Sequence, residues 1–191
     1  PEQIYDENDT YMYGMVPYPF LIRGLGSDVY VINIAATIPY QLLDLATYTC
    51  DRHYIDYVYS TALKTGFHVS NGAVDGQLQN CQLNPSAYAH QGLYYDSIPL
   101  GTAENIRKIL WRDATPYLLG HMTDQVLHQN FVFGGARGFH LVKENGYGPS
   151  GYCLGQGVDQ CTNAIQVDDI GSGGLDLINT QIVTVNGTSG H

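Results

Sequence analysis

Two adjacent carboxylates, Asp168 and Asp169, are the clearest candidates for chemistry in this chain. Hydrolysis of a glycosidic bond requires two carboxyl groups, one kept protonated as a proton donor and one ionised. Neighbouring side chains on a strand point to opposite faces, so both serve one site only if the strand ends there. Gly171-Ser172-Gly173-Gly174 favours such an end, and an acidic turn that closes a strand is the alternative. We expect no cofactor other than a structural calcium ion near Asp159, Asp168 and Asp169, because clustered carboxylate oxygens suit that ion.

Histidines and cations offer a second chemistry, β-elimination at a uronate sugar. A base must remove the proton next to the sugar carboxylate, and cations must make that proton acidic. The candidates are His68, His140, Lys64, Arg52 and Lys143. The chain has only eight lysines and arginines, little positive charge for an anionic substrate, and histidines on a strand face are also ordinary surface residues.

Short strand-like segments recur along the chain at nearly constant spacing. One set has a polar residue in a fixed slot, and the slot residues are 24, 23, 50 and 49 residues apart: Asn33, Tyr57, Asn80, Asn130 and Asn179. We interpret the two long gaps as about two periods each. A second set repeats an apolar-polar-apolar triplet: Leu43-Asp44-Leu45, Phe67-His68-Val69, Phe139-His140-Leu141 and Ile165-Gln166-Val167. Such alternation is typical of strands with one buried face.

A repeat of about 24 residues predicts an all-β solenoid, a parallel β-helix that forms a single domain over residues 1–191. Stacking would place the slot asparagines above one another, where their amides can hydrogen-bond along the stack. It would also align Asp44, His68, His140 and Gln166 in one outward-facing column. We therefore expect the outward face to bind a ligand.

The period is lost over residues 84–119, which we interpret as one inserted loop with a short helix at 103–112. Insertions in solenoids commonly form loops on the binding side. Trp111, Tyr94 and Tyr95 are therefore candidates for a sugar-stacking platform. The alternative is that these rings pack the insertion onto the solenoid.

Composition and charge exclude several classes of protein. A chain of 191 residues that is 44% hydrophobic can bury one continuous core, and 22 glycines with 16 tyrosines are typical of a turn-rich β protein. The net charge of −10 argues against binding to nucleic acid or to an anionic membrane. No apolar run approaches the roughly 20 residues of a membrane span.

The four cysteines are Cys50, Cys81, Cys153 and Cys161, and none has the CxxC spacing of a metal site. In an oxidising compartment we expect a local bridge between Cys153 and Cys161. Buried free thiols in stacked coils are the alternative.

Four segments carry a resemblance to a known family: Arg23-Gly24-Leu25-Gly26-Ser27-Asp28-Val29-Tyr30, His53-Tyr54-Ile55 with Leu63-Lys64-Thr65-Gly66, Asn130-Phe131-Val132-Phe133-Gly134, and Gly157-Val158-Asp159-Gln160-Cys161. Over roughly two thirds of the chain, the sequence resembles the pectate-lyase-like superfamily, in particular its rhamnogalacturonase-like and polygalacturonase-like members. The resemblance implies a right-handed β-helix that is secreted and acts on a polysaccharide.

Polygalacturonase-type hydrolases of this superfamily carry an Asp-Asp pair followed about one coil later by Gly-His. Asp168-Asp169 and Gly190-His191 match that order, with 22 residues between Asp169 and His191. The resemblance therefore implies acid and base roles for the two aspartates and a substrate contact for His191. The chain departs from the pattern at Ile170, where those enzymes usually have cysteine, and it lacks their Asn-Thr-Asp one coil upstream.

We therefore expect a secreted, polysaccharide-active β-helix protein, with hydrolysis by Asp168 and Asp169 preferred. The residues expected to contact the glycan are Asp44, His68, His140, Lys143, Trp111 and His191. The alternatives are a non-catalytic fibre, spike or adhesin segment, and a polysaccharide lyase. Because the superfamily's capping helix has no counterpart in this sequence, we expect a middle segment of a longer protein, whose ends are covered by its other segments or by further copies of the chain.

Overall fold

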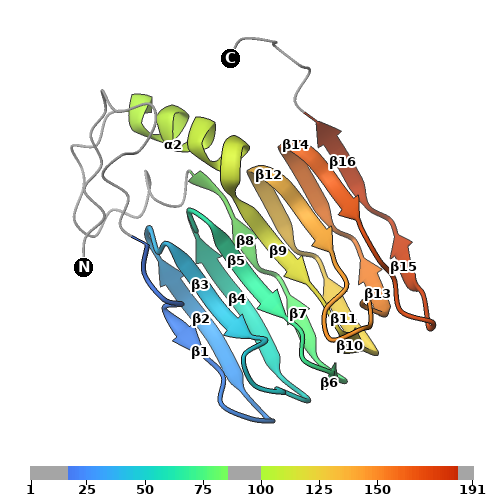
Figure 1. Ribbon diagram of the computed structural model, residues 1–191. Helices are drawn as coiled ribbons and strands as arrows, with labels where there is room; N and C mark the ends of the chain where they lie inside the picture. Colours follow the sequence, from blue (N-terminus) through green and yellow to red (C-terminus); the bar gives the residue numbers. More distant parts are fainter. Residues whose placement is uncertain (1–16, 86–99, 185–191) are drawn as a thin grey trace.

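In the computed structural model of the chain, the described residues are 17–85 and 100–184. They wind into a parallel β-solenoid of about six turns (Figure 1). Every pairing between the strands of the described segments is parallel, as in Tyr30 opposite Tyr54 and Gln41 opposite Thr65. The predicted all-β solenoid with turns of about 24 residues is therefore confirmed.

Three ladders of stacked strands run along the solenoid. The first ladder contains β1 (Ile22–Arg23), β3 (Gln41–Leu45), β5 (Thr65–Val69), β9 (Thr115–Leu119) and the second halves of β12 (Phe131–Leu141) and β14 (Gly157–Val167). The second contains the first halves of β2 (Tyr30–Ala36) and β4 (Tyr54–Ser60) with β7 (Gln77–Gln79), β11 (Gln125–His128), β13 (Gly151–Leu154) and β15 (Leu175–Ile178).

The third ladder contains the remaining halves of β2, β4, β12 and β14 with β8 (Gln82–Leu83) and β16 (Gln181–Thr184). A short pair, β6 (Ala73–Val74) with β10 (Met122–Thr123), lies between the first and second ladders. Each turn of the chain passes through the second, third and first ladders in that order. We number the turns from β2, so that β4 and β5 belong to turn two and β13 and β14 to turn five.

One residue per turn adopts a left-handed backbone at the corner between the second and third ladders. The φ angles lie between 51° and 65° at Asn33, Tyr57, Asn80, Gln129, Gly155 and Asn179. Asparagine and glycine tolerate this conformation best, which explains why the slot is mostly asparagine. The prediction that Asn130 fills the slot is wrong by one residue, because Gln129 forms that corner and Asn130 follows it.

Asn130 instead points into the solenoid, where its side chain is buried. Its Oδ1 accepts a hydrogen bond from the Cys81 backbone N–H (3.1 Å), and its Nδ2 donates to the Leu78 carbonyl (2.9 Å). In the next turn, Gln156 donates to the Leu127 carbonyl (2.8 Å) and accepts from the Asn130 N–H (3.3 Å). These buried amides satisfy backbone groups of neighbouring turns and so fix the register of the stack.

The insertion is shorter than predicted. The helix α2 (Leu100–Asp113) contains the predicted helical residues, but Thr115–Leu119 forms β9 and pairs with both β5 and β12. Leu118 stands where the other triplets have a polar residue, and this apolar side chain concealed the strand in the sequence pattern. The gap between Asn80 and Gln129 is therefore one turn plus an insertion, not two turns.

The helix α2 lies along one edge of the solenoid (Figure 1). Ile106 and Leu110 are buried against Leu63 of turn two. At the far end of the helix, the Trp111 indole N–H donates to the Gln160 carbonyl of turn five. The helix thus contacts turns that are not neighbours in the stack.

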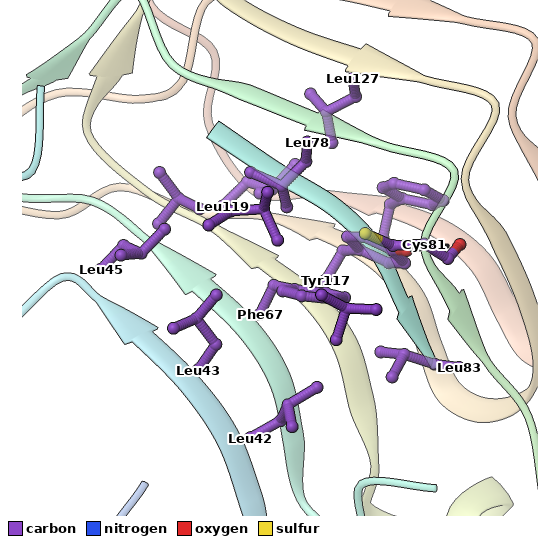
Figure 2. Packing of buried hydrophobic residues seen from close by; sticks show 14 of the residues in the cluster. Leu42, Leu43, Leu45, Phe67, Leu78, Cys81, Leu83, Tyr117, Leu119 and Leu127 are labelled. Atoms are coloured by element: carbon purple, nitrogen blue, oxygen red, sulfur yellow. Dashed lines mark hydrogen bonds between the residues drawn. The ribbon is translucent and has the colours of Figure 1, made fainter. Parts of the chain in front are cut away.

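The core is a continuous stack of leucines and aromatic rings (Figure 2). Phe67, Tyr117 and Phe139 lie above one another in successive turns, with ring centroids 5.1 Å and 4.5 Å apart. All four cysteines are buried free thiols, so the expected Cys153–Cys161 disulfide is wrong. Burial raises the pKa of the Cys81, Cys153 and Cys161 thiols to about 12, which keeps them protonated and unreactive.

Replacing Asn130 with alanine tests the buried amide. We expect Asn130→Ala to lower the free energy of unfolding by about 2–4 kcal/mol, because the Cys81 N–H and the Leu78 carbonyl lose their partner inside the solenoid. Urea denaturation followed by circular dichroism measures the loss. Thr180→Ala is the matched control, since the buried Thr180 hydroxyl has no partner among the described residues. Equal stability of the two variants would contradict this role.

Candidate functional site

The outward face of the first ladder carries the predicted polar column. Pairing aligns its residues in successive turns as Asp44, His68, Leu118, His140 and Gln166. The predicted alignment is therefore confirmed, with Leu118 as an additional apolar member between the two histidines. One turn, which carries Leu118, lies between His68 and His140, so these histidines do not form one site by direct contact.

The most closely connected group on this face surrounds Asp168. Its Oδ2 lies 2.7 Å from His140 Nε2, and its Oδ1 accepts a hydrogen bond from Gln166 Nε2 at 2.9 Å. Arg137 Nε donates in turn to Gln166 Oε1 at 2.8 Å. The side chain of Asp168 is 50% exposed, while that of His140 is 15% exposed. A half-exposed carboxylate is therefore held in a fixed orientation by a histidine and an amide.

The hydrogen bond from Gln166 lowers the pKa of the Asp168 carboxyl below its usual value of 3.8, and the contact with His140 lowers it further. Asp168 is consequently ionised at neutral pH. An ionised carboxylate only accepts hydrogen bonds, so the proton of a neutral His140 ring belongs on Nε2. His140 Nδ1 then carries the free lone pair, and no described residue forms a hydrogen bond with it.

Asp169 lies beside this group but has different partners. Its Oδ2 is 3.4 Å from Lys143 Nζ, and its Oδ1 accepts from the Ile170 backbone N–H at 2.9 Å. The strand β14 ends at Val167, so both aspartates follow the strand, as a shared site requires. The pair is thus placed at a strand end, with a cation or histidine beside each carboxylate.

His68 also contacts a carboxylate, from a residue that the sequence did not single out. Both Glu144 carboxylate oxygens lie 3.1 Å from His68 Nε2. Glu144 follows β12 in turn four, and its side chain reaches across turn three to turn two. Gly120 permits this path, because a Cβ at that position would collide with the Glu144 carboxylate and the Ser70 hydroxyl.

Two other residues expected to contact a glycan do not join this group. Asp44 is only 1% exposed, because Arg23 and the turn residues Ala46 and Thr47 hold both of its oxygens. Trp111 fastens α2 to the solenoid, as the packing alternative predicted. His191 lies outside the described residues.

Tyr94 and Tyr95 also lie outside the described residues.

Within the described part of the chain, no three His, Cys, Asp or Glu side chains approach closely enough to hold a metal ion. Asp159 lies in the third ladder, whereas Asp168 follows the end of β14 in the first ladder, which separates two of the three proposed calcium ligands. An internal cavity beside Phe139 and Cys153 has room for about one water molecule. The candidate site is therefore the exposed face itself.

Comparisons with protein-family models, with curated proteins and with solved structures give no match. The parallel solenoid is therefore shown by the structure, while membership of the pectate-lyase-like superfamily stays a prediction. No helix of the described segments is long and apolar enough to cross a membrane.

The environment of Asp168 can be tested by titration. We expect its pKa, measured by carbon NMR of the labelled carboxyl, to lie below 3.8 and to rise toward 3.8 in Gln166→Leu, because this variant removes the largest cause of the shift. A lowered pKa favours the ionised form, so the carboxyl becomes protonated only at more acidic pH than usual. Lys143→Ala is the control, since Lys143 contacts Asp169 instead. An unchanged pKa in Gln166→Leu would contradict this assignment.

Proposed function

We propose that this β-solenoid acts on uronate-containing polysaccharide by β-elimination, with His140 as the base and Asp168 as the residue that positions it. The observation that supports this most is the 2.7 Å contact between His140 Nε2 and the ionised Asp168 carboxylate. A histidine held by a carboxylate has its second nitrogen free to accept a proton and is stabilised when it becomes charged. The proposal rests on this pair rather than on the two adjacent carboxylates.

In this reaction, His140 Nδ1 takes the proton on the carbon next to the uronate carboxylate. The electron pair of that C–H bond forms a carbon–carbon double bond, and the bond to the glycosidic oxygen breaks. The leaving oxygen then receives a proton from solvent. Atoms and electrons balance in this step with only the histidine base and a solvent proton, without an oxidant, a metal or a second carboxylic acid.

Two cations support an anionic substrate at this position. Lys143 is exposed and follows the same strand as His140, and Arg137 reaches the group through Gln166. A cation near the uronate carboxylate makes the neighbouring proton more acidic. The carboxylates of Asp168 and Asp169 balance these two cations, so these four side chains together carry no net negative charge, although the whole chain carries a net charge of −10.

Hydrolysis by Asp168 and Asp169, which the sequence favoured, has less support. One carboxyl must donate a proton at neutral pH. The pKa of Asp168 is shifted in the opposite direction, and Asp169 lies beside a lysine ammonium. Asp168 therefore suits the role of a base or of a positioning residue better than that of a proton donor.

Turnover on a panel of polysaccharides tests the proposal. We expect an unsaturated uronate product, detected by its ultraviolet absorbance, from a uronate polymer such as polygalacturonate. His140→Ala and Asp168→Asn should each lower turnover about 100- to 10,000-fold, because general base catalysis is lost. His121→Ala is the matched control, since His121 stacks on Tyr147 at a corner of the solenoid.

The product identifies the reaction. Reducing ends without unsaturation would contradict elimination and favour hydrolysis. Full activity of His140→Ala would exclude His140 as the base. Folded variants that change nothing, together with no product from any polymer, would favour the non-catalytic alternative.

One observation favours that alternative of a structural segment in a larger assembly. In turn six, Leu177 and Ile182 are 48% and 50% exposed, although they align with the buried Cys153 and Val158 of turn five. Core positions of this kind are normally covered by a further turn or a partner. Concentration-dependent sedimentation of the intact chain, with Leu177→Glu as the test variant, distinguishes assembly from a single solenoid.

A further inference from the structure

A second face of the solenoid carries tyrosine rings that the proposed reaction does not use. On the outward side of the second ladder, pairing aligns Tyr30, Tyr54, Gln77, Val126 and Tyr152 in successive turns. Tyr30 is 66% exposed and Tyr152 is 48% exposed. The rings of Tyr30 and Tyr54 are neighbours, with centroids 6.4 Å apart. Exposed aromatic rings therefore stand in turns one and five of this column, and Asp176 follows Tyr152 in turn six.

A network of hydrogen bonds lies directly beside these rings. The Tyr54 hydroxyl donates to Asp56 Oδ2 at 3.1 Å and accepts from Gln79 Nε2 at 2.6 Å. Asn80 Nδ2 donates to Asp56 Oδ1 at 2.9 Å. The network joins turns two and three, so donors and acceptors are held in place next to the aromatic surface.

The spacing of the column suits an extended ligand. Strands in a sheet are about 4.8 Å apart, so the four steps from Tyr30 to Tyr152 span about 19 Å along the solenoid axis. The rings project from a sheet face, which presents a flat surface rather than a pocket. A flat aromatic surface with fixed polar groups matches the apolar face and the hydroxyl edge of a sugar ring.

The charges on this face define the kind of glycan. On the outward face of the second ladder, the charged side chains among the described residues are Asp56 and Asp176, and no lysine or arginine occupies a paired position there. Carboxylates repel an anionic polymer and accept hydrogen bonds from neutral hydroxyl groups. A neutral chain fits this face better than the uronate polymer proposed for the first ladder.

We propose that the outward face of the second ladder, formed by Tyr30, Tyr54 and Tyr152 with Asp56 and Gln79, is a binding platform for a neutral polysaccharide. It lies on a different ladder from His140, and it binds without turnover. A second copy of this chain is the competing occupant. The charged and amide groups of the network argue against it, because charged residues are depleted at the centre of protein interfaces. The platform would hold the solenoid on a mixed polymer while the first ladder acts on its acidic part.

Binding to a soluble, neutral β-linked glucan, measured by affinity gel electrophoresis, tests the platform. We expect retardation of the intact protein by the glucan and about tenfold weaker binding of the double variant Tyr30→Ala, Tyr152→Ala, because both exposed rings are lost. Tyr48→Ala is the matched control, since Tyr48 is about as exposed as Tyr152 but lies outside this column. Asp56→Asn, which retains the shape of the network, should bind at least as well as the unchanged protein.

Three outcomes would overturn the inference. They are the absence of glucan binding, equal losses in the Tyr48 control and the double variant, and a dimer in sedimentation that the double variant converts to a monomer. The last outcome would identify the face as an interface between copies. Turnover of a short uronate substrate should be unchanged in the tyrosine variants, so failure of the platform is separable from failure of His140 as the base.

Discussion

Parallel stacking in a fixed register is the constraint on which every other feature of this molecule depends. Each turn must place an apolar side chain above an apolar one and bend at the same position as the turn before it. At the corner between the second and third ladders, one left-handed residue per turn makes the bend, and the buried amides of Asn130 and Gln156 bind backbone groups of adjacent turns. A shift by one residue would reverse the two faces of a strand and leave these amides without partners. The outward columns exist because this register is preserved.

The sequence predicted the solenoid because its signals are local. An alternating triplet such as Phe67-His68-Val69 identifies a strand by itself, and equal spacing indicates stacking. The prediction was wrong where a local signal was missing or ambiguous. Because β9 has Leu118 at the position where the other triplets have a polar residue, the sequence pattern did not identify this strand. The insertion was therefore interpreted as an extra period. Gln129 and Asn130 are both polar amides, and only the backbone conformation shows which of them turns the corner.

The candidate site was predictable to the same degree. His140 and Gln166 follow from the column, and Asp168 follows from its place at the end of a strand. Partners that depend on side-chain reach were not predictable, because no sequence spacing indicates that Glu144 crosses a whole turn to His68 or that Arg137 contacts Gln166. The burial of Asp44 was missed for a related reason. Its carboxylate is covered by the turn that follows it, although its position in the ladder faces outward.

The helix α2 affects how the solenoid unfolds. In a simple solenoid each turn touches only its neighbours, so the ends can fray one turn at a time. Here a single helix is buried against Leu63 in turn two and bonded to Gln160 in turn five. Unfolding any of the turns between them would break one of these contacts of α2. The middle of the solenoid should therefore unfold as one cooperative unit. Hydrogen exchange would then proceed in two classes, a fast one at the outer turns and a slow, uniform one beneath the helix.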